Sequence, residues 1–111
     1  MLAVTFCRDS RNRLSSVFAT GHAEFAEHGE DIVCAAVSAI LQAARLGLES
    51  HARVQLEASQ SSGELRLVWP EAARDDVAVR AIVATAELSV EQIATQYPAH
   101  VRFHRKTDPA A

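Results

Sequence analysis

The chain has 111 residues, of which 49% are hydrophobic and 23% charged, and its formal net charge is −3. This length supports one hydrophobic core, and the composition is that of a globular domain rather than a disordered or fibrous chain. No basic run extends beyond Arg105-Lys106, so we predict no direct nucleic-acid partner. Neither a signal-peptide pattern nor an unbroken apolar stretch of about 18 residues is present, which predicts a cytoplasmic protein with no membrane association.

The first half of the chain predicts a hairpin, a loop and a helix. Apolar residues alternate over 2–7 and again over 14–19, with a polar turn between the two runs, which is typical of a β-hairpin. Residues 20–30 show neither a strand nor a helix period, and long loops of this kind in compact domains are often functional. From Asp31 an almost wholly apolar run predicts a helix to about Leu48, buried on more than one side.

The second half repeats the same layout without repeating the sequence. Alternation over 52–58 predicts a half-buried strand, 60–63 a turn, and 65–69 the returning strand. Apolar residues at helical spacing from Val79 to Tyr97 predict an amphipathic helix, with Glu87 and Glu91 off its apolar stripe. A short strand follows at 101–103.

The predicted order is therefore β-β-α-β-β-α-β. This order indicates an α+β fold in which two helices cover a mostly antiparallel sheet. We assign residues 1–105 to a single domain and 106–111 to a flexible C-terminal tail.

The two cysteines form no disulfide framework, so each thiol needs its own explanation. If Asp31 is the N-cap of the predicted helix, Cys34 lies in its first turn, beside amide groups that have no partner within the helix. Those amides and the positive end of the helix dipole would stabilise a thiolate, and they would also stabilise the oxyanion of a tetrahedral intermediate. His22 follows a glycine at the end of a strand, and its imidazole is suited to accept a thiol proton.

Other interpretations of these residues remain open. A single cysteine in an alanine-rich helix is more often a packing residue than a nucleophile, so on these physical grounds alone a structural role of Cys34 is favoured. Asp31 is better suited to cap the helix than to orient His22. A zinc site from Cys7, His22, His28 and Cys34 lacks the short paired spacing of such sites, and we predict no metal or cofactor. The acidic loop residues are most simply a solvated surface, although they would attract a basic peptide; they are Glu24, Glu27, Glu30 and Asp31.

The same segment carries a recognisable signature. It reads "GHA", five residues, "G", one residue, then "DIVCAAVSAI", and it covers residues 21–40. This pair of blocks at fixed spacing resembles the signature of the ribosomal-processing cysteine protease family, Prp. The chain length and the order of elements are also similar to that family.

The resemblance implies a cytoplasmic cysteine endopeptidase that removes the N-terminal extension of a large-subunit ribosomal protein during ribosome maturation. Matched by position, the Cys-His dyad is His22 and Cys34, while Asp31 and Ser38 match further positions of the signature and are assigned supporting roles. The resemblance also implies that the protein is a homodimer. The rival hypothesis is a non-enzymatic ribosome-assembly or scaffold module in which Cys34 is buried and structural. The loop that the resemblance expects to close over substrate consists of Gly21, Ala23, Glu24, Phe25, Ala26, Glu27, His28, Gly29 and Glu30.

The predicted mechanism combines both arguments. His22 takes the proton of Cys34, the thiolate attacks the scissile carbonyl, amides at the helix end hold the oxyanion, and water hydrolyses the thioester. Residues 23–30 exclude water and position the peptide.

Overall fold

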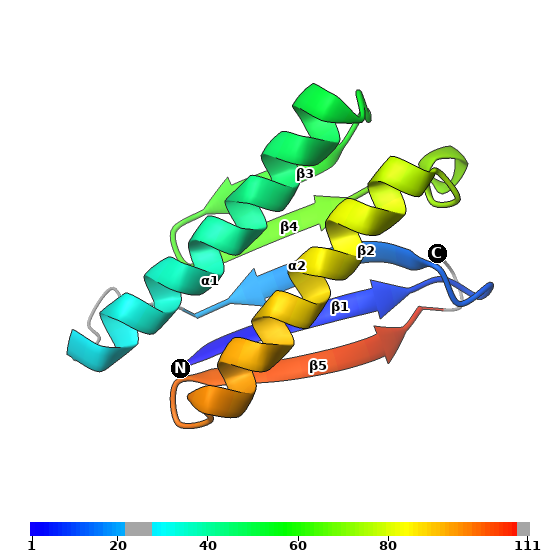
Figure 1. The fold of residues 1–111 in the computed structure, drawn as a ribbon. Helices are drawn as coiled ribbons and strands as arrows, with labels where there is room; N and C mark the ends of the chain where they lie inside the picture. The colour runs from blue at the N-terminus through cyan, green and yellow to red at the C-terminus, as the bar shows by residue number, and fades with distance from the viewer. Residues whose placement is uncertain (22–27, 109–111) are drawn as a thin grey trace.

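The computed structural model describes residues 1–21 and 28–108, without the side chains of 28–31. Within this part of the chain, five strands form one sheet in the order β3-β4-β2-β1-β5 (Figure 1). The strands are β1 (Leu2–Arg8), β2 (Leu14–Thr20), β3 (Glu57–Ser61), β4 (Glu64–Val68) and β5 (Val101–Thr107). Neighbouring strands are antiparallel except β1 and β5, which run parallel. The predicted α+β fold with a mostly antiparallel sheet is confirmed.

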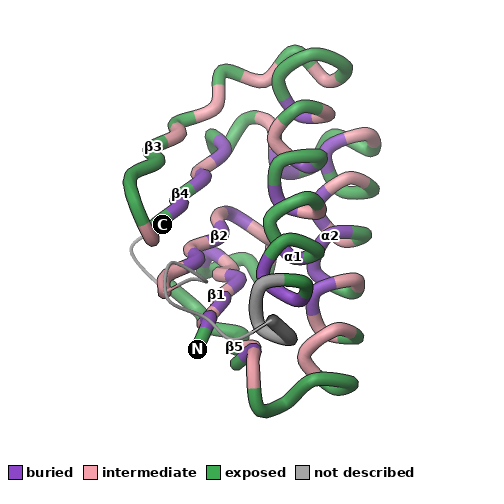
Figure 2. The backbone as a smooth tube through the Cα atoms, turned by 90° about the vertical axis from the view of Figure 1, so that its left-hand side faces the viewer, coloured by how far each residue is buried: buried purple, intermediate pink, exposed green. Residues whose placement is uncertain are grey.

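Helices α1 (His28–Leu46) and α2 (Val77–Gln96) lie side by side over one face of this sheet (Figure 1). Successive strand residues alternate between the two faces, so Leu2, Val4 and Phe6 of β1 are buried under the helices. Cys7, in contrast, lies half-buried on the opposite face. The tube in Figure 2 shows buried positions of strands and helices facing each other across this single core.

The start of α1 differs from the prediction. The helix begins at His28 rather than after an N-cap at Asp31, so residues 28–30 of the expected loop are helical and Asp31 is the fourth residue of α1. Gly29 does not prevent this extension, because a glycine inside a helix costs only about 1 kcal/mol relative to alanine and packing of the helix outweighs it. Thr20, at the other side of the expected loop, is the last residue of β2. The rest of the loop, residues 22–27, lies outside the described residues.

The strand predicted over 52–58 begins to pair with its neighbouring strand at a later residue than expected. Burial alternates from Ala52 onward as the pattern indicated, but pairing with β4 begins only at Glu57 and continues to Ser61, inside the predicted turn. Arg53 has a left-handed φ of 58°, which turns the chain as it leaves the helical turn η2 (Gly47–His51) that follows α1. This turn delays the approach of the chain to its partner strand.

Two features of the C-terminal half also differ from the prediction. Glu87, expected on the wet side of α2, is buried and accepts two hydrogen bonds from Arg8 of β1, at 2.7 and 2.9 Å. Arg105 of β5 donates to the same carboxylate at 3.1 Å, so Glu87 ties α2 to two parallel strands. Strand β5 itself extends to Thr107, which places two residues of the predicted tail 106–111 in the sheet.

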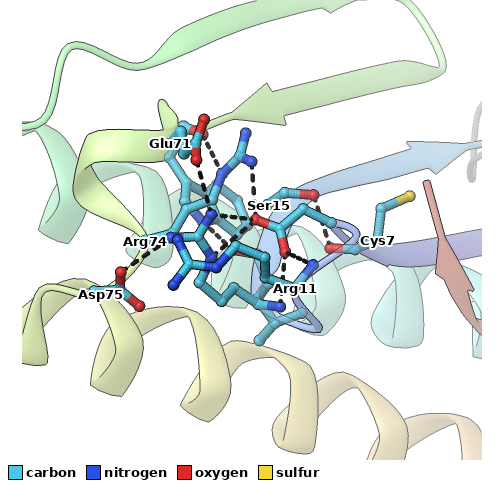
Figure 3. Close-up of polar contacts among 10 residues, drawn as sticks. Cys7, Arg11, Ser15, Glu71, Arg74 and Asp75 are labelled. Carbon is cyan, nitrogen blue, oxygen red and sulfur yellow. Dashed lines mark hydrogen bonds and ion pairs between the residues drawn. The ribbon is translucent and has the colours of Figure 1, made fainter. Parts of the chain in front are cut away.

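A buried ion cluster closes the turn between β1 and β2 (Figure 3). Asp9 is only 1% exposed, and its carboxylate accepts the main-chain N–H groups of Arg11 and Arg13 at 2.9 and 3.0 Å. The side chains of Arg13 and Arg74 donate to its other oxygen at 3.0 and 3.1 Å. Burial alone would raise the pKa of Asp9, but these hydrogen bonds outweigh it and hold the pKa well below its ordinary value.

The run Ile32–His51 is long and apolar enough to cross a membrane by length and composition alone. The core helix of a soluble protein passes the same test, and α1 packs here on the sheet and on α2. Only a third of this apolar stretch is buried inside the chain, so much of its outer surface is exposed.

Candidate active site

A cavity of about 380 Å³ lies between α1 and the end of the sheet where β2, β3 and β4 meet. Apolar residues of the core line part of it, with polar residues of the β3–β4 turn around them. Its lining residues are Leu2, Ala19, Gly21, Cys34, Ala35, Val37, Ser38, Leu41, Gln42, Gln60, Ser61, Ser62, Gly63, Glu64 and Leu65.

Cys34 and Ser38 reach this cavity from one face of α1. They lie four residues apart, so they stand one above the other on the helix. Cys34 is buried, being 6% exposed, whereas Ser38 is exposed. The structure therefore brings three of the sequence-predicted site residues, Gly21, Cys34 and Ser38, to one cavity, and Cys34 is the buried one among the two on the helix.

The position of Cys34 in the helix changes one part of the predicted chemistry. Cys34 is the seventh residue of α1, beyond the first turn whose amide groups lack helical partners. The prediction that helix-end amides beside Cys34 stabilise the thiolate and the oxyanion is therefore wrong, since that end lies at His28 and the dipole effect falls off within the first turn.

Gly21 fixes the chain immediately before His22. Its N–H donates to the carbonyl of Gly63 at 2.9 Å, which joins the end of β2 to the β3–β4 turn on the cavity rim. Its φ of 80° is left-handed, and a Cβ atom at this position would overlap the main-chain carbonyl oxygen of Met1. Only glycine fits both requirements, so the direction in which the chain leaves β2 is tightly set.

We expect Gly21→Ala to lower kcat/KM by at least about tenfold and to lower the melting temperature, because alanine at positive φ costs about 1–2 kcal/mol and the Met1 carbonyl must also move. Peptide cleavage and thermal unfolding measure the two effects. Asn12→Ala, at a φ of 63° in the turn between β1 and β2 and outside the cavity lining, is the matched control for backbone strain. Unchanged cleavage by Gly21→Ala would show that this glycine does not position its neighbour.

The remaining predicted site residues are placed only in part. His22 and the expected loop residues Ala23, Glu24, Phe25, Ala26 and Glu27 lie outside the described residues. His28, Gly29, Glu30 and Asp31 are backbone positions of the first turn of α1. In the part of the chain that the structure describes, no group of three or more His, Cys, Asp or Glu side chains is arranged to hold a metal ion.

The two cysteines of the alternative zinc site lie on different sides of the sheet. Cys34 is on the helix that covers one face, and Cys7 points to the other face, with Ser16 and Lys106 as its strand neighbours. This separation argues against a shared metal.

The sequence did not reveal the opposite wall of the cavity. Gln60, Gly63 and Leu65 belong to the β3–β4 hairpin, about 30 residues after Cys34, and only strand pairing carries this hairpin to the end of β2. The alternation of Leu65 and Leu67 predicted that one face of the hairpin is buried, but it did not predict which segment packs against that face.

Comparison with known proteins agrees with the signature in the sequence. The family model described as "Cysteine protease Prp" matches residues 1–102. A ribosomal processing cysteine protease Prp of Staphylococcus aureus is 28% identical over 109 residues, covering 96% of this chain and 100% of the relative. The Mycoplasma pneumoniae protein of that name is 49% identical over 55 residues, which are 49% of this chain and 55% of the relative.

Solved structures show the same fold. A Streptococcus mutans protein has a TM-score of 0.83 and 30% identity, covering 97% of this chain and 96% of the other. The S. aureus ribosomal processing protease Prp, in complex with a substrate peptide, has a TM-score of 0.86 and 22% identity, covering 96% of this chain and 100% of the other. With a family model that spans nearly all of its length, this chain belongs to the cysteine protease Prp family.

Proposed function

We propose that this protein is an endopeptidase that uses Cys34 as nucleophile and His22 as general base. The observation that carries the proposal is the position of Cys34, whose side chain lines a cavity that also contains Gly21, the residue directly before His22. Nucleophilic cysteine catalysis needs a thiol and an imidazole. Cys34 supplies the thiol, and His22, which directly follows Gly21 in the sequence, would supply the imidazole.

The mechanism follows from this pair. His22 accepts the proton of Cys34, and the thiolate attacks the scissile carbonyl carbon of a peptide held in the cavity. The tetrahedral intermediate collapses to a thioester as the amine leaves with the proton returned by His22. Water then hydrolyses the thioester and regenerates the thiol.

We further propose that the substrate is the N-terminal extension of a large-subunit ribosomal protein, cleaved in the cytoplasm. The S. aureus and M. pneumoniae relatives are named ribosomal processing proteases, and the S. aureus protease has been solved with a substrate peptide. The cavity suits such a segment, since its apolar residues Leu2, Leu41 and Leu65 would bury apolar side chains of an extended chain.

The direct test is incubation of the purified protein with the extended ribosomal protein from the same host, followed by mass spectrometry of the products. One internal cut that leaves a mature N-terminus is the expected result. A substrate left intact under reducing conditions would contradict the proposal.

The scaffold hypothesis is distinguished by thiol reactivity. If Cys34 is catalytic, iodoacetamide modifies it faster than Cys7 in the folded protein, and the rate titrates below about pH 8. Slow and equal labelling of both thiols, relieved only by denaturation, would instead favour the scaffold.

We also propose that the protein is a homodimer, formed through the outer surface of its helices. Ile32 and Leu46 are 72% and 64% exposed on α1, and Leu88 is 59% exposed on α2. Among the residues that the structure describes, those lining a shallow groove between the helices are all uncharged. From Ile32 to Ala44, α1 carries no charged residue, so a second copy of the same uncharged surface is a complementary partner.

Ala43→Glu tests this interface, because Ala43 is exposed and lines the groove. Near a two-fold axis the new carboxylate would meet like charge or apolar surface, so we expect the dimer dissociation constant to rise at least about 100-fold. Sedimentation equilibrium measures it, and Ala99→Glu, an exposed position in the turn after α2, is the matched control. A wild-type monomer at tens of micromolar, or an intact dimer of Ala43→Glu, would contradict the proposed interface.

A further inference from the structure

A side-chain bridge joins the two walls of the Cys34 cavity. The Nε2 group of Gln42, on α1, donates a hydrogen bond of 3.1 Å to Oε1 of Gln60, on β3. Both residues line the cavity and both are exposed to solvent. Gln60 stands opposite Leu65 in the hairpin, on the face of the sheet that α1 covers.

The bridge lies at a definite distance from the thiol along the helix. Gln42 follows Cys34 by eight residues, which is about 12 Å along the helix axis. Ser38 and Leu41 line the cavity between them. An extended peptide advances about 3.3 Å per residue, so three to four residues of substrate fit between the scissile bond and the bridge.

The bridge retains hydrogen-bonding capacity at the cavity lining. Each glutamine amide has one carbonyl oxygen and two N–H donors, and the mutual bond uses one donor of Gln42 and the oxygen of Gln60. The Gln42 oxygen and the Gln60 amino group are not used by this bond. One acceptor and one donor match the N–H and C=O groups of an extended polypeptide main chain.

We propose that Gln42 and Gln60 form the end of the substrate groove and bind the main chain of the substrate residue three or four positions from the scissile bond. They are specificity-determining residues, because a peptide that reaches them gains hydrogen bonds that a shorter peptide lacks. This inference rests on the proposed function, since it assigns the recognition of the same substrate at the same cavity.

Peptides of graded length test the inference. Peptides from the extended ribosomal protein are shortened one residue at a time, in one series before the scissile bond and in another series after it. For the wild-type protein we expect kcat/KM to rise about five- to tenfold when the third or fourth residue is added on one side, and to change little beyond it. In Gln42→Met/Gln60→Met we expect this step, taken as the ratio of kcat/KM for the longer peptide to kcat/KM for the shorter one, to fall below twofold.

Methionine keeps the length and unbranched shape of glutamine, and both positions are exposed, so the double variant is expected to fold. Gln92→Met, at an exposed position of α2 that does not line the cavity, is the matched control and keeps the full step. If the step is the same in the double variant, or absent in the wild type, the inference is wrong while the protease function stands. If the wild-type protein cleaves no peptide of any length, the proposed function itself is overturned and the inference with it.

Discussion

Cys34→Ala is expected to abolish peptide cleavage, lowering the rate by roughly 10⁴-fold or more, because alanine has no group that can form the covalent intermediate. The fold should persist. Replacing one buried sulfur with hydrogen removes little packing, and the expected cost in the free energy of unfolding is about 1 kcal/mol. A cleavage assay with the extended ribosomal protein and a thermal melt of the same sample measure the two quantities.

Cys7→Ala is the matched control for this variant. Cys7 is the second thiol of the chain and lies on the face of the sheet away from the helices and the cavity. We expect Cys7→Ala to cleave at the wild-type rate. Cleavage by Cys34→Ala within tenfold of wild type would place the nucleophile elsewhere, and the same loss in both variants would indicate a general effect of thiol removal.

Asp9→Asn is expected to cause the largest loss of stability, lowering the melting temperature by on the order of 10 °C. Asp9 is buried and its carboxylate receives four hydrogen bonds from three arginines, one of which, Arg74, is itself only 7% exposed. An asparagine keeps the shape but removes the charge, and its amino group faces arginine donors. The buried guanidinium of Arg74 then loses its ionic partner.

Asp75→Asn is the control for this loss. Asp75 lies at the rim of the same cluster (Figure 3). It pairs with Arg13 at 3.0 Å, but its side chain is 69% exposed. Solvent-exposed pairs contribute little, so the melting temperature should change by no more than about 2 °C. Equal melting temperatures for Asp9→Asn and the wild type would contradict the structural role of the cluster.

The contribution of Asp9 also has a predicted pH dependence. Its pKa in the folded protein lies well below the unfolded value of about 3.9, so its stabilisation is fully present above that value. As pH falls below about 4, the unfolded chain takes up a proton that the folded chain does not, and this stabilisation is lost progressively. The difference in melting temperature between wild type and Asp9→Asn should therefore shrink below about pH 4 and stay constant between pH 5 and 7.

Periodicity predicted most of the elements because one side of each strand and helix is buried. Leu2, Val4 and Phe6 follow a period of two since the helices cover only one face of β1. The same reasoning was wrong for Glu87. Its charge predicted a solvent-exposed position, but Arg8 and Arg105 donate hydrogen bonds to its carboxylate from two neighbouring strands. A sequence shows the charge of a residue but not the distant partners that permit its burial.

Boundaries were less predictable for a related reason. Asp31 is a suitable N-cap residue, but α1 begins three residues earlier, since local capping preference is worth only about 1 kcal/mol and tertiary packing overrides it. The pairing of β3 depends on the left-handed turn at Arg53, which no hydrophobic pattern reveals.

The sequence by itself determined the α+β order, the candidate nucleophile and base, and the family, because local periodicity and the fixed spacing of the two signature blocks are properties of the linear chain. Only the tertiary structure decided what faces Cys34. The wall formed by Gln60 to Leu65 and the bridge to Gln42 arise from the pairing of β4 with β2, a contact between segments more than 40 residues apart. Such contacts are selected by the burial of a whole sheet face, so no short stretch of sequence contains them.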